Sequence, residues 1–351
     1  MEKTTTVTSK DSLLLKTLAR EQTSRPPFWF MRQAGRVLPS YRALKERYSL
    51  WQMMNSPDIG ANVTLLPVDD LGVDAAILFS DILMVPYAMG MGLEFTETGP
   101  VFCSPLSGSS NPLAELNPDP SKLNFVYSII DKVVLNKPSA IPLIGFCGAP
   151  LTVLCYMIQG LGKKADFPEA IKFMYENKSI TKKLVKAVTD LTIEYVRGQI
   201  KHGINIFQLF ESHAGLVPLD LYKELFMPAV KQIGQVVKEN NIPFIFFPKG
   251  FGAGIEAVTP DVCDYLSIDW QIPLEMARKM VHKDIGLQGN LDPRLLYASR
   301  EEIALQLQTY IAFGQKNHHW IFNLGHGFMP DTPYENAKFV ADWIKNTNWQ
   351  R

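Results

Sequence analysis

Two arginines four residues apart, Arg32 and Arg36, follow an apolar run with no acidic residue between them. Like charges at this spacing repel each other on a helix, so the pair needs an anionic partner. A planar guanidinium group matches carboxylates and phosphates, and the small Ala34 and Gly35 allow a ligand to approach the backbone. These residues therefore predict an anion site. Ion pairs of both arginines with acidic side chains elsewhere in the fold are an equally good interpretation.

A second candidate is Asp81, which is embedded in apolar sequence at the end of a predicted strand. A carboxylate there loses solvent and needs donors, but a helix cap or a satisfied ion pair is the better interpretation of this residue alone. Tyr156 and Ser212 are weaker candidates, because such a tyrosine is more often a core aromatic and such a serine often caps a loop or helix. What strengthens each of these residues as a candidate is its position after a predicted strand.

The histidine His326 gives a stronger signal, because glycines precede and follow it. Gly325 and Gly327 indicate a special backbone that something approaches closely. A binding loop fits this pattern better than a packed core does.

Eight short apolar runs recur along the chain and predict the strands that position these residues. Continuous apolar runs suit strands that are buried on both faces, as in a parallel sheet. Helical patterns lie between them, at 171–201, 219–240 and 301–313 among others. The runs are Phe28–Met31, Ala75–Phe79, Pro142–Phe146, Asn205–Phe210, Pro243–Phe247, Tyr265–Ile268, Ile285–Gln288 and Trp320–Asn323.

Eight strands that alternate with helices predict a single-domain (β/α)8 TIM barrel, with a doubly wound sheet as the competing architecture. We expect one domain over residues 1–351, with its core at about 10–345. Polar residues follow the predicted strands, and in a barrel these ends converge on one C-terminal mouth, which would hold the active site. The stretch from Gly92 to Pro120 is rich in Pro, Gly, Ser and Asn and predicts a long surface excursion.

The composition limits the partners of the chain. Its 351 residues carry 35 basic and 35 acidic side chains, so broad electrostatic capture of nucleic acid or of a membrane surface is not expected. The stretch from Ala140 to Gly162 lacks charged residues, but its prolines and glycines predict a strand, a turn and a helix start rather than a membrane span. Four scattered cysteines and a polar N-terminus without a signal peptide favour a cytoplasmic protein.

No sequence motif indicates a metal or a cofactor. The chain has no dinucleotide-binding glycine pattern, no Walker loop, and no nucleophile elbow. Its six histidines and four cysteines show no ligand spacing, and His318-His319 is more typical of a solvated loop than of a metal site. We therefore expect Arg, Asp, Tyr, Ser and His side chains to act directly on the substrate.

Five motifs together resemble the uroporphyrinogen decarboxylase family. They occur in the order found in that family and span roughly residues 10 to 345. They are Phe30-Met-Arg-Gln-Ala-Gly-Arg36, Phe79-Ser-Asp-Ile-Leu83, Phe210-Glu-Ser-His-Ala-Gly215, Gln288-Gly-Asn-Leu-Asp-Pro293 and Asn323-Leu-Gly-His-Gly327.

The resemblance implies a cytoplasmic, homodimeric barrel enzyme without metal or organic cofactor. Its substrate would be uroporphyrinogen III, a reduced tetrapyrrole with four acetates and four propionates, and its products coproporphyrinogen III and carbon dioxide. Asp81, Arg32 and Tyr156 would be catalytic, with Asp81 facing the pyrrole N–H groups and Tyr156 orienting it by a hydrogen bond. The remaining implied substrate-binding residues are Gln33, Ala34 and Gly35, which would act through their backbone, together with Arg36, Ser212 and His326.

Two rival hypotheses follow from the same residues. A corrinoid- or zinc-dependent methyltransferase would share the barrel, but it needs thiolate and imidazole ligands, and Cys263 has no His-x-Cys partner. A non-catalytic tetrapyrrole-binding protein would use the same pocket, and only a turnover measurement separates it from an enzyme.

Overall fold

The computed structural model describes residues 12–96, 99–160 and 166–351, and one parallel sheet organises them. Its strands follow one another in the order β1-β4-β5-β6-β7-β8-β9, each parallel to its neighbours. The strands are β1 Ala76–Ile77, β4 Leu143–Gly148, β5 Ile206–Glu211, β6 Phe244–Pro248, β7 Tyr265–Ser267, β8 Gly286–Gln288 and β9 Trp320–Ile321.

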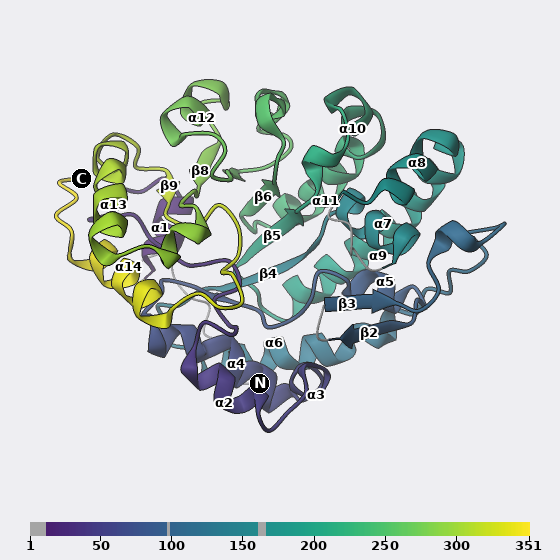
Figure 1. The fold of residues 1–351 in the computed structure, drawn as a ribbon, viewed down its shortest axis with the longest axis horizontal. Helices are drawn as coiled ribbons and strands as arrows, with labels where there is room; N and C mark the ends of the chain where they lie inside the picture. The colour runs from purple at the N-terminus through teal and green to yellow at the C-terminus, as the bar shows by residue number, and fades with distance from the viewer. Residues whose placement is uncertain (1–11, 97–98, 161–165) are drawn as a thin grey trace.

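Helices enclose this sheet, and Figure 1 shows β4, β5 and β6 at the centre, α13 and α14 on one side and α8 and α10 on the other. Every residue of β4 and of β6 is buried, as the continuous apolar runs predict for strands covered on both faces. Seven of the eight predicted strand positions are therefore confirmed as members of one parallel sheet.

The remaining predicted strand, Phe28–Met31, which is the first along the chain, is not a regular strand. Phe28 makes a single parallel bridge to Phe322, where the Phe322 N–H donates to the Pro27 carbonyl at 2.9 Å. On its other side the Asp74 N–H donates to the Phe28 carbonyl at 2.9 Å. The segment thus lies between the β9 and β1 edges of a curled seven-stranded sheet. The preceding Pro27 has no N–H to donate, which shortens any ladder here. The prediction of a regular (β/α)8 barrel is therefore confirmed only in part. The described residues form a curled parallel sheet, but this sheet has seven strands.

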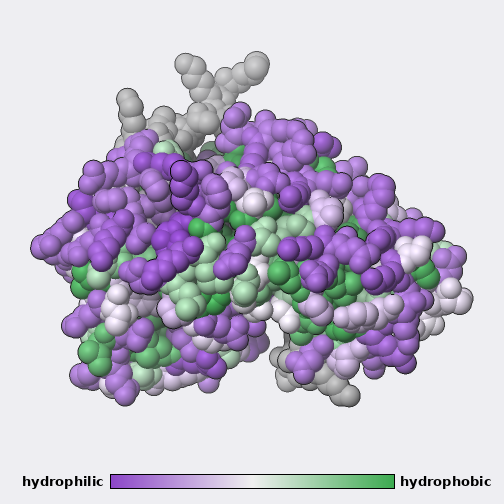
Figure 2. Space-filling view, turned by 90° about the horizontal axis from the view of Figure 1, so that it is seen from above, coloured by the Kyte–Doolittle hydropathy of each residue, from purple (hydrophilic) through white to green (hydrophobic). Residues whose placement is uncertain are grey.

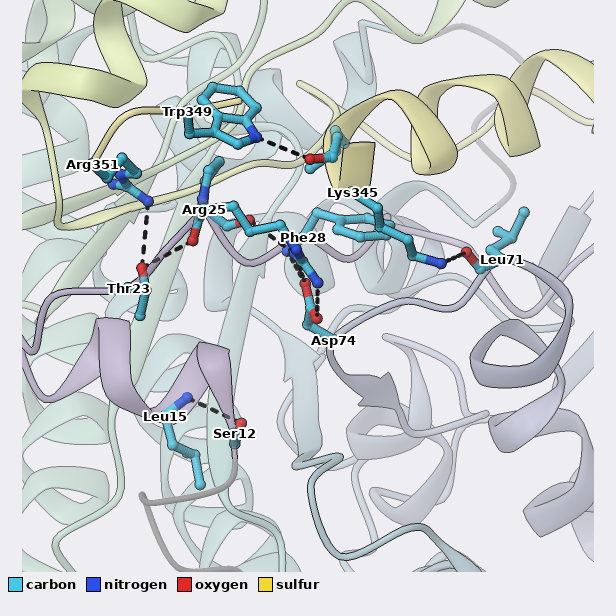
Figure 3. A network of polar contacts seen from close by, with 12 residues as sticks. Ser12, Leu15, Thr23, Arg25, Phe28, Leu71, Asp74, Lys345, Trp349 and Arg351 are labelled. Carbon is cyan, nitrogen blue, oxygen red and sulfur yellow. Dashed lines mark hydrogen bonds and ion pairs between the residues drawn. The ribbon is translucent and has the colours of Figure 1, made fainter. Parts of the chain in front are cut away.

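A polar network holds the segment 28–31 in place (Figure 3). The Asp74 carboxylate accepts from both terminal nitrogens of Arg25, at 2.6 and 2.8 Å, and from the Phe28 N–H at 2.8 Å. The Arg25 guanidinium lies 5.4 Å from the centre of the Phe28 ring, and the Lys345 ammonium lies 5.7 Å from it. Lys345 also donates to the Leu71 carbonyl at 2.9 Å. A bidentate, partly buried ion pair thus holds the chain shortly before residues 32–36, the arginine loop, which begins and ends with an arginine.

Two of the predicted helical stretches are each divided into two helices. The first is interrupted at Asn177, whose side chain bonds back to the Phe173 carbonyl at 3.2 Å, and the second at Phe226, just before Pro228 in the first turn of the next helix. The helices are α1 Leu13–Leu18, α2 Pro39–Lys45, α3 Leu50–Asn55, α4 Pro57–Asp70, α5 Met84–Ala88, α6 Asn124–Asn136, α7 Pro150–Gln159, α8 Pro168–Glu176, α9 Lys178–Lys201, α10 Leu219–Leu225, α11 Met227–Glu239, α12 Leu274–Met280, α13 Arg300–Lys316 and α14 Tyr334–Asn346.

The excursion predicted between Gly92 and Pro120 carries structure of its own. Strands β2 Leu93–Thr96 and β3 Gly99–Phe102 pair in antiparallel fashion, and the short 3-10 helix η1 Leu106–Gly108 follows. Further 3-10 helices are η2 Pro120–Leu123, η3 Ala214–Leu216, η4 Gly252–Ala257 and η5 Pro293–Tyr297.

The uncharged stretch from Ala140 to Gly162 folds as predicted, with β4 and then α7, up to the limit of the described residues at 160. Within the described ranges no helix combines the length and the apolar character needed to cross a membrane. Figure 2 shows hydrophilic residues over much of one face and a band of hydrophobic residues across its middle, an ordinary mixture for a folded surface.

Candidate active site

The predicted site residues follow the carboxyl ends of parallel strands, which point to one side of the sheet. These residues come from separate parts of the chain. Asp81 follows β1, Tyr156 lies in α7 after β4, Ser212 follows β5, and His326 lies beyond β9.

Asp81 lies in the turn that connects β1 to α5. Its Oδ1 accepts the Leu83 N–H at 2.9 Å, and the adjacent Ile82 carbonyl accepts the Gly148 N–H at 3.3 Å, which ties the turn to the end of β4. Burial raises the pKa of Asp81, while the Leu83 N–H and the positive charge of Arg32 act in the opposite direction. Asp81 is therefore a partly buried carboxylate whose charge depends on nearby donors and cations.

Arg32 carries a positive charge that acts on Asp81. Its backbone has a φ of 61°, which is uncommon for a residue with a side chain and is typical of positions that the surrounding structure must hold in place. Among the described residues, no carboxylate forms an ion pair with Arg32 or with Arg36. Within the described ranges, the acidic partners that the structural interpretation of these arginines requires are therefore absent.

Tyr156 lies beside this pair, on α7. Burial raises the pKa of its hydroxyl, and the negative charge of Asp81 raises it further, whereas Arg32 lowers it. Both residues are within the described ranges, and no hydrogen bond joins the Tyr156 hydroxyl to Asp81 there. The structure thus brings Tyr156 into the electrostatic field of Asp81 without the orienting hydrogen bond that the resemblance implies.

The imidazoles of His213 and His326 lie near these residues, and together with Asp81, Arg32 and Tyr156 they form the Asp81 cluster. Burial lowers the pKa of His326 to about 3, with further contributions from Arg32 and Lys249, and burial lowers the pKa of His213 to about 4, helped by Lys249. Both rings are therefore neutral at pH 7 and can each donate or accept a hydrogen bond. The His213 ring centre lies 5.8 Å from that of Tyr156. Sequence reasoning did not select His213, although it adjoins Ser212 in the same motif.

The residues between the two arginines shape the arginine loop. Gln33 is fully buried, and its side chain accepts from the Phe30 N–H at 2.9 Å and donates to the Ala75 carbonyl at 2.9 Å. The backbone N–H groups of Gln33 and Gly35 donate to the carbonyls of Phe30 and Gln33, at 3.0 and 3.1 Å. Ala34, between them, is partly buried. Gln33 therefore holds the loop to the β1 side of the sheet.

Arg36 and Ser212 are not joined to the Asp81 cluster by direct contacts among the described residues. Arg36 is exposed and lines a cavity of about 470 Å³ together with Arg42 and the segment 330–335. Ser212 is partly exposed just beyond β5.

Sequence reasoning also missed the role of Glu211, a fully buried carboxylate at the end of β5. It accepts from the Thr152 N–H and hydroxyl, both at 2.6 Å, from the Leu151 N–H at 3.3 Å and from the Tyr222 hydroxyl at 3.1 Å. These donors include the first turn of α7, so Glu211 anchors the helix that carries Tyr156. Burial raises the pKa of Glu211 to about 7 against the effect of these donors.

The floor below the cluster is polar, although it is buried. Gln288 accepts from the Trp29 indole N–H at 3.0 Å and donates to Gln208 and to Ser267, both at 3.0 Å. Such an internal network fixes the relative positions of strands β5, β7, and β8 and of the Trp29 segment. It thereby fixes the spacing of the loops above it.

A larger cavity, of about 830 Å³, lies between Trp270 and α13, and its lining includes Asn290, Asp292 and Arg294. It contains none of the predicted site residues. Across the part of the chain that the structure describes, no three or more His, Cys, Asp or Glu side chains are grouped so that they could hold a metal ion.

Replacing Gly327 by alanine should weaken binding of uroporphyrinogen, the substrate that the resemblance implies, by raising KM about tenfold. A Cβ atom at Gly327 would lie 2.4 Å from both Cγ and Cδ of Arg32, so the arginine side chain would have to leave its position. Steady-state kinetics checks this. Gly108→Ala is the matched control, since no atom lies within 4 Å of the added methyl group. An unchanged KM in Gly327→Ala would show that this position of Arg32 does not matter for binding.

The sequence of the chain is similar to those of known proteins. A family model described as uroporphyrinogen decarboxylase matches residues 9–347. A uroporphyrinogen decarboxylase from Christiangramia forsetii is 37% identical over 96% of this chain and 98% of its own length, and one from Chloroherpeton thalassium is 38% identical over 96% and 97%.

Solved structures extend the comparison to the fold. A methyltransferase from Methanosarcina mazei matches with a TM-score of 0.73 over 95% of this chain and 98% of that one, at 16% identity, which speaks to the fold alone. The family model and the curated relatives, in contrast, cover nearly the whole chain in sequence. The chain therefore belongs to the uroporphyrinogen decarboxylase family.

Proposed function

We propose that this protein is a carboxy-lyase that removes the four acetate carboxylates of uroporphyrinogen III in sequence, giving coproporphyrinogen III and carbon dioxide in porphyrin biosynthesis. Curated relatives named for this activity align over nearly the full chain. The observation that carries the proposal is the partly buried Asp81 carboxylate, which lies within the electrostatic reach of Arg32, a cation without an ion pair among the described residues.

The chemistry requires an electron sink. Loss of carbon dioxide leaves an electron pair on the acetate methylene, and a pyrrole ring protonated at carbon can accept that pair. A proton then adds to the methylene to give a methyl group, and the ring carbon releases its proton. Each cycle thus consumes one proton and releases one carbon dioxide. A fixed anion beside the cationic ring stabilises the transition state without having to reorganise.

The site residues supply these requirements. Asp81 would face the pyrrole N–H groups and stabilise the ring cation, and Arg32 would hold the reacting carboxylate and help to deliver the proton. Tyr156 would act on Asp81 through its nearby hydroxyl. The remaining side arms would contact the backbone of the Gln33-Ala34-Gly35 segment and the side chains of Arg36, Ser212 and His326. Fixed geometry of this kind lowers the entropic part of the barrier.

The experiment is anaerobic incubation of the pure, metal-stripped protein with uroporphyrinogen III, followed by separation of the products by carboxylate number. We expect products with seven, six, five and four carboxylates in succession. Tetrapyrrole binding without loss of carboxylate would instead support a binding protein. A requirement for added zinc would support the methyltransferase-like alternative.

We further propose that the chain is one domain, acts as a cytoplasmic homodimer and needs no metal or organic cofactor. One hydrophobic cluster includes residues from Leu14 to Trp349, which supports a single domain. The sink for electrons is the substrate's own pyrrole ring, so the scheme needs no additional group. Sedimentation at micromolar concentration tests the dimer.

A further inference from the structure

Lys249 lies at the carboxyl end of β6, and its backbone is fixed from both sides. Its N–H donates to the Glu211 carbonyl at 3.0 Å, and its carbonyl accepts the Gly215 N–H at 3.2 Å. The next N–H, of Gly250, donates to the Asp269 carboxylate at 2.6 Å. Lys249 is thus tied to the ends of β5 and β7 and has little freedom to move its Cα atom.

The side chain of Lys249 reaches toward the site. Its ammonium lies 5.7 Å from the centre of the Trp270 ring, a distance at which a cation and an aromatic face attract each other. The Trp270 N–H would lie only 2.5 Å from a Cβ atom at Gly325, so this tryptophan packs against the glycine that precedes His326. The His326 ring in turn lies 6.2 Å from Phe247, two residues before Lys249. These contacts place Lys249 beside the His326 loop.

The positive charge of Lys249 is not paired with a carboxylate in the described part of the chain. Among the residues that the structure describes, none of the ion pairs includes Lys249. The nearby Asp269 carboxylate is occupied by the backbone N–H groups of Gly250 and Gln271, at 2.6 and 2.8 Å. Its neighbours His213 and His326 are kept neutral, so neither neutralises nor repels the ammonium. A cation held without a counterion in a partly dry site favours an anionic ligand.

Lys249 and Arg32 follow different parts of the sheet. Arg32 follows the segment between β9 and β1, whereas Lys249 follows β6, three strands from β1 and three from β9 in the strand order. The two unpaired cations therefore lie on opposite walls of the site. A disc-shaped substrate with carboxylate arms around its rim needs cations on more than one wall, because one cluster reaches only one part of the rim.

We propose that Lys249 is a further substrate-binding residue, which holds a carboxylate side arm on the wall opposite Arg32. The inference rests on the proposed decarboxylation of uroporphyrinogen and adds the position of a second anchoring cation. Lys249 would bind an arm distant from the reacting acetate. It would therefore affect binding much more than the chemical step.

The test compares Lys249→Met with Lys249→Arg. We expect Lys249→Met to raise KM for uroporphyrinogen about 10- to 100-fold, the range for loss of a charge-assisted hydrogen bond, with kcat changed less than about threefold. Lys249→Arg should stay within about threefold of the parent. Lys186→Met on α9, which removes a lysine that is 76% exposed, is the control for an unspecific loss of charge. Melting temperatures verify that each variant is folded.

Binding is also measured in the Asp81→Asn background by anaerobic equilibrium dialysis of uroporphyrinogen, so that the result does not require turnover. If the parent binds the macrocycle but releases no carbon dioxide, the proposed function fails and the dialysis still decides the role of Lys249. A KM and a dissociation constant within about twofold of the matched parent in Lys249→Met would overturn the inference. So would Lys249→Arg binding as weakly as Lys249→Met.

Discussion

Replacing Asp81 by asparagine is expected to lower kcat by about 10²- to 10³-fold, the usual cost of removing a preorganised electrostatic contact to the transition state. Asparagine keeps an oxygen at the position that accepts the Leu83 N–H at 2.9 Å, so the turn should be preserved and only the charge lost. The measurement is single-turnover release of carbon dioxide from uroporphyrinogen. The control, Asp190→Asn, removes an exposed carboxylate on α9 and should leave kcat unchanged.

The pH dependence of the parent provides a second measurement for the same residue. The proposed active form has Asp81 ionised, and its pKa in the free protein is raised by burial. As the pH falls through that raised pKa the carboxylate gains a proton, so kcat/KM should fall at a higher pH than for an ordinary aspartate, about 3.9. This acidic limb should be absent from Asp81→Asn. A variant that kept both the limb and most of the turnover would rule out the proposed role.

Replacing Glu211 by glutamine is expected to destabilise the fold by about 2–4 kcal/mol, among the larger effects of single substitutions. The carboxylate accepts from four donors, two of them at 2.6 Å, and is fully buried. An amide presents its own N–H groups to some of these donors, which leaves buried donors unsatisfied. Urea unfolding and the melting temperature measure the effect.

A graded control accompanies this second prediction. Tyr222→Phe removes one donor, the hydroxyl at 3.1 Å, and keeps the ring, so it should cost about 1 kcal/mol. A stability of Glu211→Gln equal to that of Tyr222→Phe would show that the contacts with Leu151 and Thr152 contribute nothing measurable. Glu211 would then not anchor α7.

Much of the fold was predictable from the sequence because burial on both faces of a parallel strand demands continuous apolar residues. Runs such as Phe244–Pro248 satisfy that demand locally, and seven of the eight predicted positions are strands. The break at Phe226 was also encoded locally, by Pro228, although the helical periodicity concealed it. The exception, Phe28–Met31, depends on partners at distant positions in the chain.

Some features of the site were likewise predictable from the sequence, and others were not. The sequence by itself determined the residue types and the family motifs, including Arg32, Asp81 and His326, because a glycine-flanked histidine and an arginine pair without acids are local features. Only the tertiary structure decided which charges stay unpaired. Arg25 is neutralised by Asp74, whereas Arg32 and Lys249 have no acidic partner among the described residues.

The same distinction separates binding groups from structural ones. The side chains of Gln33 and Glu211 are polar and lie near strand ends, like the proposed ligands of the substrate, yet the hydrogen bonds of these side chains are used within the fold. Pairing and desolvation are set by neighbours that lie 40 to 60 positions away in the chain, at Ala75 for Gln33 and at Thr152 for Glu211. Local sequence carries no record of those distances, and for this reason the electrostatics of the site emerged only with the folded chain.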